Sequence, residues 1–324
     1  MKFSDNAMCA ILLCSYIGLS KDDTIKPFSL GEWNTFLDKI IENKLEPKVI
    51  FNREIDWGNI LSYPTDEVER IKELSSRGGS VAFELEDLSN KGIDTITLFD
   101  SDYPPLLKRK LKKKTPPVLF YAGDITLAQK IGIAVVGSRD VDEAGMEFTR
   151  KLVEKAAKEK LVIYSGGAKG VDTISEITAI NNGGAVVAFV ADSLLARIKK
   201  QGVVNNIINR QLLLITDVKP ETGFTVARAM NRNKFIYTSA YAAFVVSSDY
   251  NKGGTWTGAV EALRNDWGKT LVWNHNEYEG NRKLIEKGAV PYELAEKKLY
   301  DIITEKAAFE QMNLFDMDGT NNNQ

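Results

Sequence analysis

The stretch IGIAVVGSR at residues 131–139 decides the fold class of this chain. Its first six residues are small or apolar without a break, which is typical of a strand buried on both faces of a sheet. The three residues that follow, Gly137, Ser138 and Arg139, suit a turn that leads into a helix. A buried strand followed at once by such a turn begins a βαβ unit, so we expect a parallel sheet to start here.

The same pattern recurs through residues 131–295. Short apolar runs alternate with stretches whose apolar residues recur every three or four positions, as on a helix face. The expected strands are 131–136, 161–164, 185–190, 212–216, 242–246 and 270–273, and the expected helices are 143–159, 172–181, 223–233, 256–266 and 280–287. This alternation predicts an α/β fold that is doubly wound around a mostly parallel sheet.

The segments on either side of this core have a different pattern. Residues 1–95 are expected to form a small helical domain, with helices at 6–19, 29–43, 65–76 and 84–91. A strand at 95–99 and a basic run at 108–114 lead to two prolines, so 96–130 is expected to be a strand and a basic linker into the core. Residues 296–324 are expected to be a short helix and a flexible polar tail.

Composition narrows the possible functions. The 324 residues are 44% hydrophobic and 27% charged, as in an ordinary globular protein of about two domains. The net charge of -2 means that nucleic-acid binding would need a local basic patch. With two cysteines, Cys9 and Cys14, and the single histidine His275, we expect no metal site and no disulfide framework.

The apolar segment at residues 8–19 raises the question of a signal peptide. It is too short to span a bilayer, and only one lysine precedes it. We expect a buried first helix, and therefore a cytoplasmic protein with no membrane partner.

Glycine-containing loops follow three of the expected strands. The second, SGGAKGVD at 165–172, is expected to bind an anion, because its glycines let the backbone approach a ligand closely and Lys169 adds a cation. Asp172 is expected to cap the next helix. The alternative to an anion-binding loop is a tight turn followed by a capped helix. The third loop, GGTWTGA at 253–259, is expected on the same edge of the sheet.

A basic, amide-rich stretch reaches the same edge. Arg228, Arg232 and Lys234, with Asn231 and Asn233, are expected to enter the fifth strand where α/β proteins bind ligands. A solvated helix face is the alternative. Because the loops offer neither paired carboxylates nor a nucleophile with a neighbouring base, the site is expected to bind its ligand without catalysis.

Taken in order, these loops resemble the DNA-processing protein A (DprA/Smf) family. The resemblance covers nearly the whole chain, and the ordered set is more specific than any one of its parts. It rests on Asp100, Tyr103, Pro104, Leu107, Pro116, Pro117, Leu119, Gly123, residues 135–139, residues 165–172, Arg232-Asn233-Lys234 and residues 284–289.

The resemblance implies a helical N-terminal domain of the SAM or helix-hairpin-helix type and an extended Rossmann-like domain. It implies a homodimer that uses no cofactor, protects single-stranded DNA and loads a RecA-type recombinase during transformation or recombination. Residues implied to hold DNA phosphates are Gly137, Ser138, Arg139, Ser165, Gly166, Gly167, Lys169, Arg232, Asn233 and Lys234. Residues implied to support the pocket are Asp172, Gly253, Gly254 and Thr255.

Several departures mark a divergent member. Glu176 stands where the family often has histidine, Arg282 stands where asparagine is usual, and the third loop differs at several positions. Only 35 residues follow Ala289, so the C-terminal winged-helix domain of many relatives is expected to be absent. A role in mobile-element maintenance or phage defence therefore stays open.

Near the C-terminus, QMNLF at 311–315 resembles the peptide by which bacterial proteins dock on the DNA sliding clamp. Its anchors would be Gln311, Leu314 and Phe315, and a frayed helix end is the alternative.

Two rival functions remain. The first is a nucleotide-binding sensor or phosphoribohydrolase-like enzyme of the lysine-decarboxylase-like Rossmann group, whose signature is partly matched by Gly253, Gly254, Thr257 and Glu261. The second is a structural adaptor, which would show no salt-sensitive DNA affinity.

Overall fold

In the computed structural model, residues 3–20 and 22–305 are described, and the chain forms two compact units. Unit 1 comprises residues 1–129 and 190–225, and unit 2 comprises 130–189 and 226–324. Neither unit is a continuous piece of chain, because the segment 190–225 leaves unit 2 and joins unit 1. This grouping differs from the consecutive division expected from the sequence.

Within residues 3–20 and 22–90, the regular elements are helices, as expected. A capping box begins α2, where the Ser29 side chain accepts from the Glu32 amide and the Glu32 carboxylate accepts from the Ser29 amide. The expected helix at 6–19 ends early, because the backbone is already extended at Ser15. The elements are α1 (Asp5–Cys14), α2 (Leu30–Glu42), η1 (Pro47–Phe51), α3 (Trp57–Ile60), α4 (Thr65–Ser76) and α5 (Gly78–Asn90).

The rest of unit 1 is built on antiparallel strands. Strand β2 (Val118–Ala122) pairs with β1 (Asp94–Thr97) on one side and with β6 (Leu212–Thr216) on the other. The segment expected to be a linker therefore contains a fully buried strand, preceded by α6 (Pro105–Leu111) and η2 (Lys112–Lys114) and followed by η3 (Ile125–Gln129). Two further helices not expected from the sequence precede β6, α9 (Leu194–Arg197) and α10 (Gln201–Ile208).

Unit 2 contains the parallel sheet. Its strands lie in the order β5-β4-β3-β7-β8-β9, and each neighbouring pair is parallel. The mostly parallel α/β fold expected from the sequence is confirmed, and only β9 was not expected. The bounds are β3 (Gly132–Val136), β4 (Val162–Ser165), β5 (Val186–Phe189), β7 (Ala242–Val245), β8 (Lys269–Trp273) and β9 (Val290–Tyr292).

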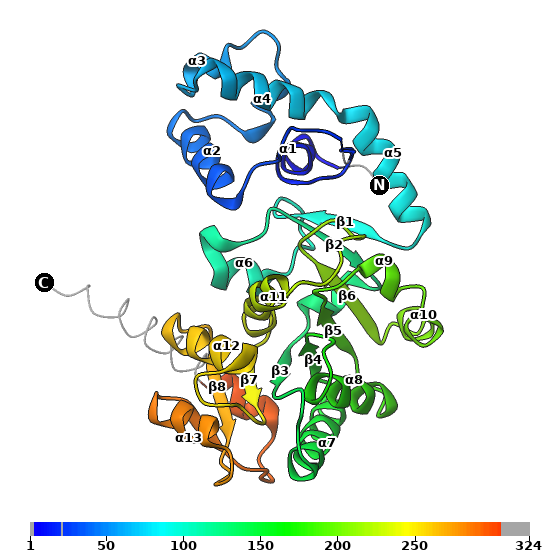
Figure 1. The fold of residues 1–324 in the computed structure, drawn as a ribbon, viewed down its shortest axis with the longest axis vertical. Helices are drawn as coiled ribbons and strands as arrows, with labels where there is room; N and C mark the ends of the chain where they lie inside the picture. The colour runs from blue at the N-terminus through cyan, green and yellow to red at the C-terminus, as the bar shows by residue number, and fades with distance from the viewer. Residues whose placement is uncertain (1–2, 21, 306–324) are drawn as a thin grey trace, which may run out of the picture. The chain divides into compact units, whose positions relative to one another are not determined.

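Helices cover both faces of this sheet. In Figure 1, α7 and α8 (green) lie on one side of β3 and β4, and α11 and α12 (olive to gold) pack together on the other. From β3 the chain winds outward through β4 and β5, whereas β7, β8 and β9 extend the sheet in the opposite direction. The helices are α7 (Glu143–Lys158), α8 (Val171–Asn181), α11 (Val226–Ser239), α12 (Gly253–Arg264) and α13 (Glu279–Glu286).

The winding direction reverses between β3 and β7. At such a switch point, the loops at the carboxyl ends of the two strands diverge and leave a crevice, which is where open α/β sheets bind ligands. Within residues 3–20 and 22–305, no helix combines the length and the apolar character that crossing a membrane requires.

Candidate nucleic-acid binding pocket

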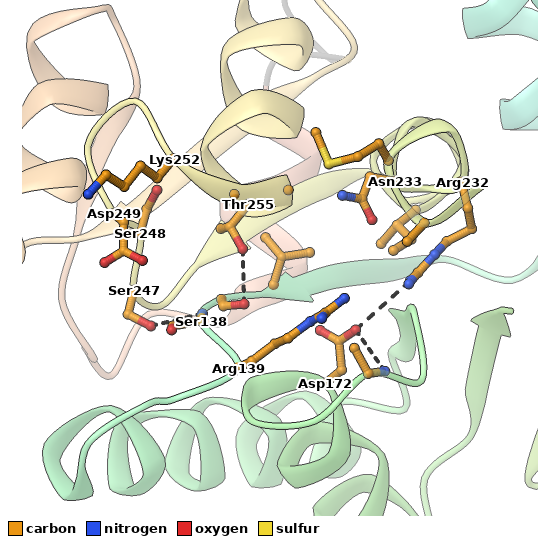
Figure 2. A pocket seen from close by; sticks show the side chains of 18 of the residues that line it. Ser138, Arg139, Asp172, Arg232, Asn233, Ser247, Ser248, Asp249, Lys252 and Thr255 are labelled. Atoms are coloured by element: carbon orange, nitrogen blue, oxygen red, sulfur yellow. Dashed lines mark hydrogen bonds and ion pairs between the residues drawn. The ribbon is translucent and has the colours of Figure 1, made fainter. Parts of the chain in front are cut away.

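A cavity of about 370 Å³ lies at this switch point. It is bounded by the loops that follow β3 and β7 and by residues of α8, α11 and α12, and Figure 2 shows these side chains converging on it. Its volume falls within the range of small-ligand sites.

The loop after β3 is fixed in place by its neighbours. The Ser138 amide donates to Ser247 Oγ at 3.1 Å, and Thr255 Oγ1 donates to the Gly137 carbonyl at 2.9 Å. A side chain at residue 137 would overlap Val171, so glycine is required there. From this loop the exposed Arg139 side chain extends along the pocket (Figure 2).

A nearly buried ion pair forms one wall. Arg232 Nη1 on α11 lies 3.9 Å from Asp172 Oδ2 on α8, and the two side chains are 7% and 11% exposed. The same Asp172 oxygen accepts from the Ala168 amide at 3.2 Å. The guanidinium lies directly over Gly166, where any β-carbon would overlap it.

Burial and charge compete at this pair. Burial raises the pKa of Asp172 above its ordinary value, and the charge of Arg232 opposes that rise, as does the hydrogen bond from the Ala168 amide. Burial also raises the pKa of Tyr237 on α11, with a further contribution from the charge of Asp172. Part of the positive charge of Arg232 is thus used to stabilise Asp172.

The opposite wall is the N-terminus of α12. No side chain caps this helix, and its first turn contains no acidic residue. The first-turn amides of a helix have no partner within the helix and carry its positive dipole end, which makes such a terminus suited to an anion. Lys252 precedes Gly253, and both line the pocket. Arg139 adds a second exposed cation to the lining, which also contains the exposed carboxylates of Asp140 and Asp249.

The pocket contains most of the site residues expected from the sequence. The lining includes Gly137, Ser138, Arg139, Asp172, Arg232, Asn233, Gly253, Gly254 and Thr255. Gly166 lies against Arg232, and the Ser165 hydroxyl is buried and accepts from the Gly167 amide at 3.4 Å. Neither Lys169, which is exposed, nor Lys234, which donates to Asn231 Oδ1 at 2.7 Å, lines the cavity. The DNA contacts assigned to these residues stay predictions.

Two local expectations were wrong. Asp172 does not cap α8, because the N-cap is Gly170, with φ +77°, and the Asp172 side chain turns toward Arg232. Residues 228–234 do not enter a strand. They lie within α11, which runs on to Ser239 because its second half, including Phe235 and Ile236, packs in the core.

Sequence reasoning missed several lining residues, among them Ser247, Ser248, Asp249 and Lys252. A usable signal was present, because Ser247 follows the expected strand at 242–246 directly. The carboxyl-end rule that selected Arg139 applies equally to this position. Tyr237 and Met230 carried no comparable signal, since they reach the pocket from within α11 and do not follow a strand.

The family model for DNA recombination-mediator protein A matches residues 94–303, which is more than half of the chain. The chain belongs to this family. All residues that line the pocket lie within the matched segment. The family membership expected from the order of the loops is therefore confirmed.

Individual relatives agree with this assignment. The DNA processing protein DprA of Streptococcus pneumoniae is 39% identical over 79 residues, 24% of this chain and 28% of the relative. That of Bacillus subtilis is 27% identical over 175 residues, 53% of this chain and 58% of the relative. The matched segments span less than two thirds of either relative.

Solved structures share the fold. The DprA structure from Streptococcus pneumoniae aligns with a TM-score of 0.65 at 20% identity and covers 90% of this chain and 95% of its own. The structure from Helicobacter pylori aligns with a TM-score of 0.53 at 21% identity and covers 67% of this chain and 96% of its own. The work on the Helicobacter protein concerns its single-stranded DNA binding mode.

Proposed function

We propose that this protein binds single-stranded DNA through the switch-point pocket and acts in DNA recombination. The observation that carries the proposal is the uncapped N-terminus of α12 at the pocket, which is also lined by the exposed cations Arg139 and Lys252. Membership of the recombination-mediator family and the DNA-binding relative from Helicobacter support a DNA ligand.

The geometry suits one unit of a DNA strand. We expect a backbone phosphate to bind at the first-turn amides of α12, with Lys252 and Arg139 adding positive charge to the same pocket. The apolar lining of Val226, Ala229 and Met230 on α11 offers a surface to a base. Single-strand binders combine the same two features, a cationic track for phosphates and apolar or aromatic surfaces for bases.

The finer roles are proposals that rest on the family resemblance. The protein protects single-stranded DNA in the cytoplasm as a homodimer and loads a RecA-type recombinase. Whether it serves transformation, a mobile element or phage defence is decided by its partners. The clamp-docking motif at 311–315 lies outside the described residues, and it stays a proposal from the sequence.

We also propose that the pocket binds its ligand without chemical turnover. The nearest rival is the nucleotide-binding or phosphoribohydrolase-like function, because a cavity of this volume also suits a mononucleotide. Incubation with AMP distinguishes the two functions. Release of free adenine by the wild type, lost in Arg139→Ala, would establish the rival.

The central experiment is a salt titration of binding to fluorescent oligo-dT, with single- and double-stranded competitors. Wild type is compared with Arg139→Ala/Lys252→Ala, which removes both exposed pocket cations. We expect salt-sensitive binding that the single-stranded competitor displaces better, and a large loss of affinity in the double variant.

Two controls sharpen this result. Lys158→Ala/Lys287→Ala removes the same charge from exposed positions of unit 2 outside the pocket lining and should bind as wild type does. Lys169→Ala tests the sequence-based contact that does not line the cavity. No binding by wild type at low salt would overturn the DNA function.

For the clamp, Leu314→Ala/Phe315→Ala should abolish pull-down of the sliding clamp. Unchanged pull-down by this variant would eliminate the proposed contact.

A further inference from the structure

Unit 1 carries a dense group of cations that the pocket does not use. This basic cluster consists of Lys108, Arg109, Lys110, Lys112, Lys113 and Lys114. The first three lie on α6, whose leucines at 106, 107 and 111 are buried, and the last three form η2, which has no buried residue. Burial of the leucines directs the basic side chains outward, and all but the half-buried Lys110 are exposed.

The basic cluster is held in place by one backbone contact and two side-chain contacts. Lys108 Nζ donates to the Leu98 carbonyl at 2.7 Å, and the Lys113 carbonyl accepts from Asn34 Nδ2 at 2.7 Å. Lys113 Nζ also lies 2.8 Å from Asp38 on α2. These contacts join the cluster to two other segments of unit 1, so its cations are presented on an ordered surface.

The backbone of the basic cluster is strained at Lys112. Lys112 has φ +52° and ψ -122°, a backbone region that favours glycine. A side chain in such a region strains the backbone, and strained positions concentrate at functional sites. No apolar contact accounts for the residue type, because Lys112 is exposed. The position thus carries a charge where glycine would be less strained.

Much of the charge is not neutralised by the protein. Lys113 is paired with Asp38, but Arg109, Lys112 and Lys114 form no ion pair with any residue in 3–20 and 22–305. Like charges this close repel one another, and a polyanion relieves that repulsion. The accumulation is local, since the net charge of the whole chain is -2.

We propose that the basic cluster is a second contact surface for the phosphate backbone of nucleic acid, separate from the pocket. This inference rests on the proposed DNA-binding function for its choice of polyanion. Its cations suit phosphates, and phosphate contacts carry no sequence information, so the surface contributes affinity without sequence preference. An anionic membrane fits less well, because surface-bound helices insert apolar side chains and the leucines of α6 are buried.

The test is the triple variant Arg109→Ala/Lys112→Ala/Lys114→Ala in the oligo-dT salt titration. Three phosphate contacts to a single strand contribute about 2 to the slope of log affinity against log salt. Between 50 and 200 mM salt, the triple variant should therefore lose about 20-fold less affinity than wild type. An unchanged slope would overturn the inference.

Matched variants keep the result specific. Lys158→Ala/Lys287→Ala/Lys298→Ala removes the same charge from exposed positions of unit 2 and should leave the slope unchanged. An equal decrease of the salt slope in both triple variants would mean that the slope follows net charge, and it would also overturn the inference. Lys112→Gly relieves the backbone, and it should lower the slope by about 0.7 without loss of stability.

The pocket variant Arg139→Ala/Lys252→Ala, measured beside these, separates this inference from the proposed function. If the pocket variant loses oligo-dT affinity and the cluster variant keeps the affinity and salt slope of wild type, the inference is wrong and the pocket function stands. If only the cluster variant loses affinity and slope, the inference stands and the pocket does not bind DNA. Wild type that binds no nucleic acid overturns both.

Discussion

Arg232 Nη1 lies 3.9 Å from Asp172 Oδ2 in a wall of the pocket where both side chains are almost fully buried. Removal of one member of a buried pair leaves an uncompensated charge, which typically costs about 3–5 kcal/mol. We expect Arg232→Met to lower the free energy of unfolding by an amount in that range, measured by urea denaturation. The double variant Arg232→Met/Asp172→Asn should recover much of the loss, and an equal or larger loss in the double variant would contradict the pairing.

The same aspartate predicts a dependence on pH. Its folded-state pKa is raised, so the protonated form is favoured by folding. Its contribution to stability is fully present below the ordinary aspartate pKa of about 3.9 and is lost as pH rises through the folded pKa. Wild type should therefore gain stability relative to Asp172→Asn as pH falls from 7 toward 4. A relative loss over that range would mean that Arg232 outweighs burial.

The absence of a side chain at Gly166 leaves room for the Arg232 guanidinium. A β-carbon at this position would overlap the Arg232 guanidinium, so Gly166→Ala should displace it, lower stability and weaken DNA binding. Gly202→Ala is the matched control, because residue 202 lies in α10 with no heavy atom near its would-be β-carbon. Thermal unfolding and oligo-dT affinity measure both effects. Equal behaviour of the two variants would refute the packing argument.

In unit 1, a capping glutamate gives a second pH prediction. A hydrogen bond from Arg70 lowers the pKa of Glu32 to about 2, with a further contribution from Ser29. The resulting stability is present above the ordinary glutamate pKa of about 4.3 and is lost as pH falls through about 2. Glu32→Gln should show less acid sensitivity than wild type over this window, followed by circular dichroism. Glu69→Gln, on an exposed position of α4, should behave as wild type.

An aromatic ring beside the pocket offers a stacking surface. Tyr250 is 40% exposed, follows the pocket residue Asp249 and packs edge-on against Trp256 with ring centroids 5.1 Å apart. Base stacking on such a ring is worth about 1–3 kcal/mol. Tyr250→Ala should weaken oligo-dT binding by that amount, while Tyr250→Phe keeps it. Tyr300→Ala, which removes another exposed ring, should have no effect.

Periodicity was sufficient to predict five of the six strands of unit 2, because each of the five is largely buried and reads as an apolar run. It missed β9, where two of the three residues are exposed. Once the strands are known, the position of Arg139 follows, because a residue directly after a central parallel strand lies at the carboxyl edge of the sheet. The same argument, applied to the loop after β7, would also have found Ser247.

The remaining errors have physical causes. Strand β2 was hidden by the two prolines before it, which were interpreted as a linker although Val118–Ala122 is an apolar run. The Arg232–Asp172 pair joins residues 60 positions apart, and no local pattern encodes such a contact. The end of α11 was set by tertiary packing of Phe235 and Ile236, which is invisible to a search for turn residues.

The excursion of residues 190–225 into unit 1 has a consequence for synthesis on the ribosome. Strand β2 obtains its second neighbour only when β6 emerges, about 90 residues later in the chain. At about 5–20 residues per second, the nascent β2 presents an unpaired apolar edge for roughly 5–20 s. Over that interval, the strands β3, β4 and β5 are already made. The first half of the polypeptide thus has a window in which edge-to-edge association competes with native pairing, and slower translation through residues 123–211 would lengthen it.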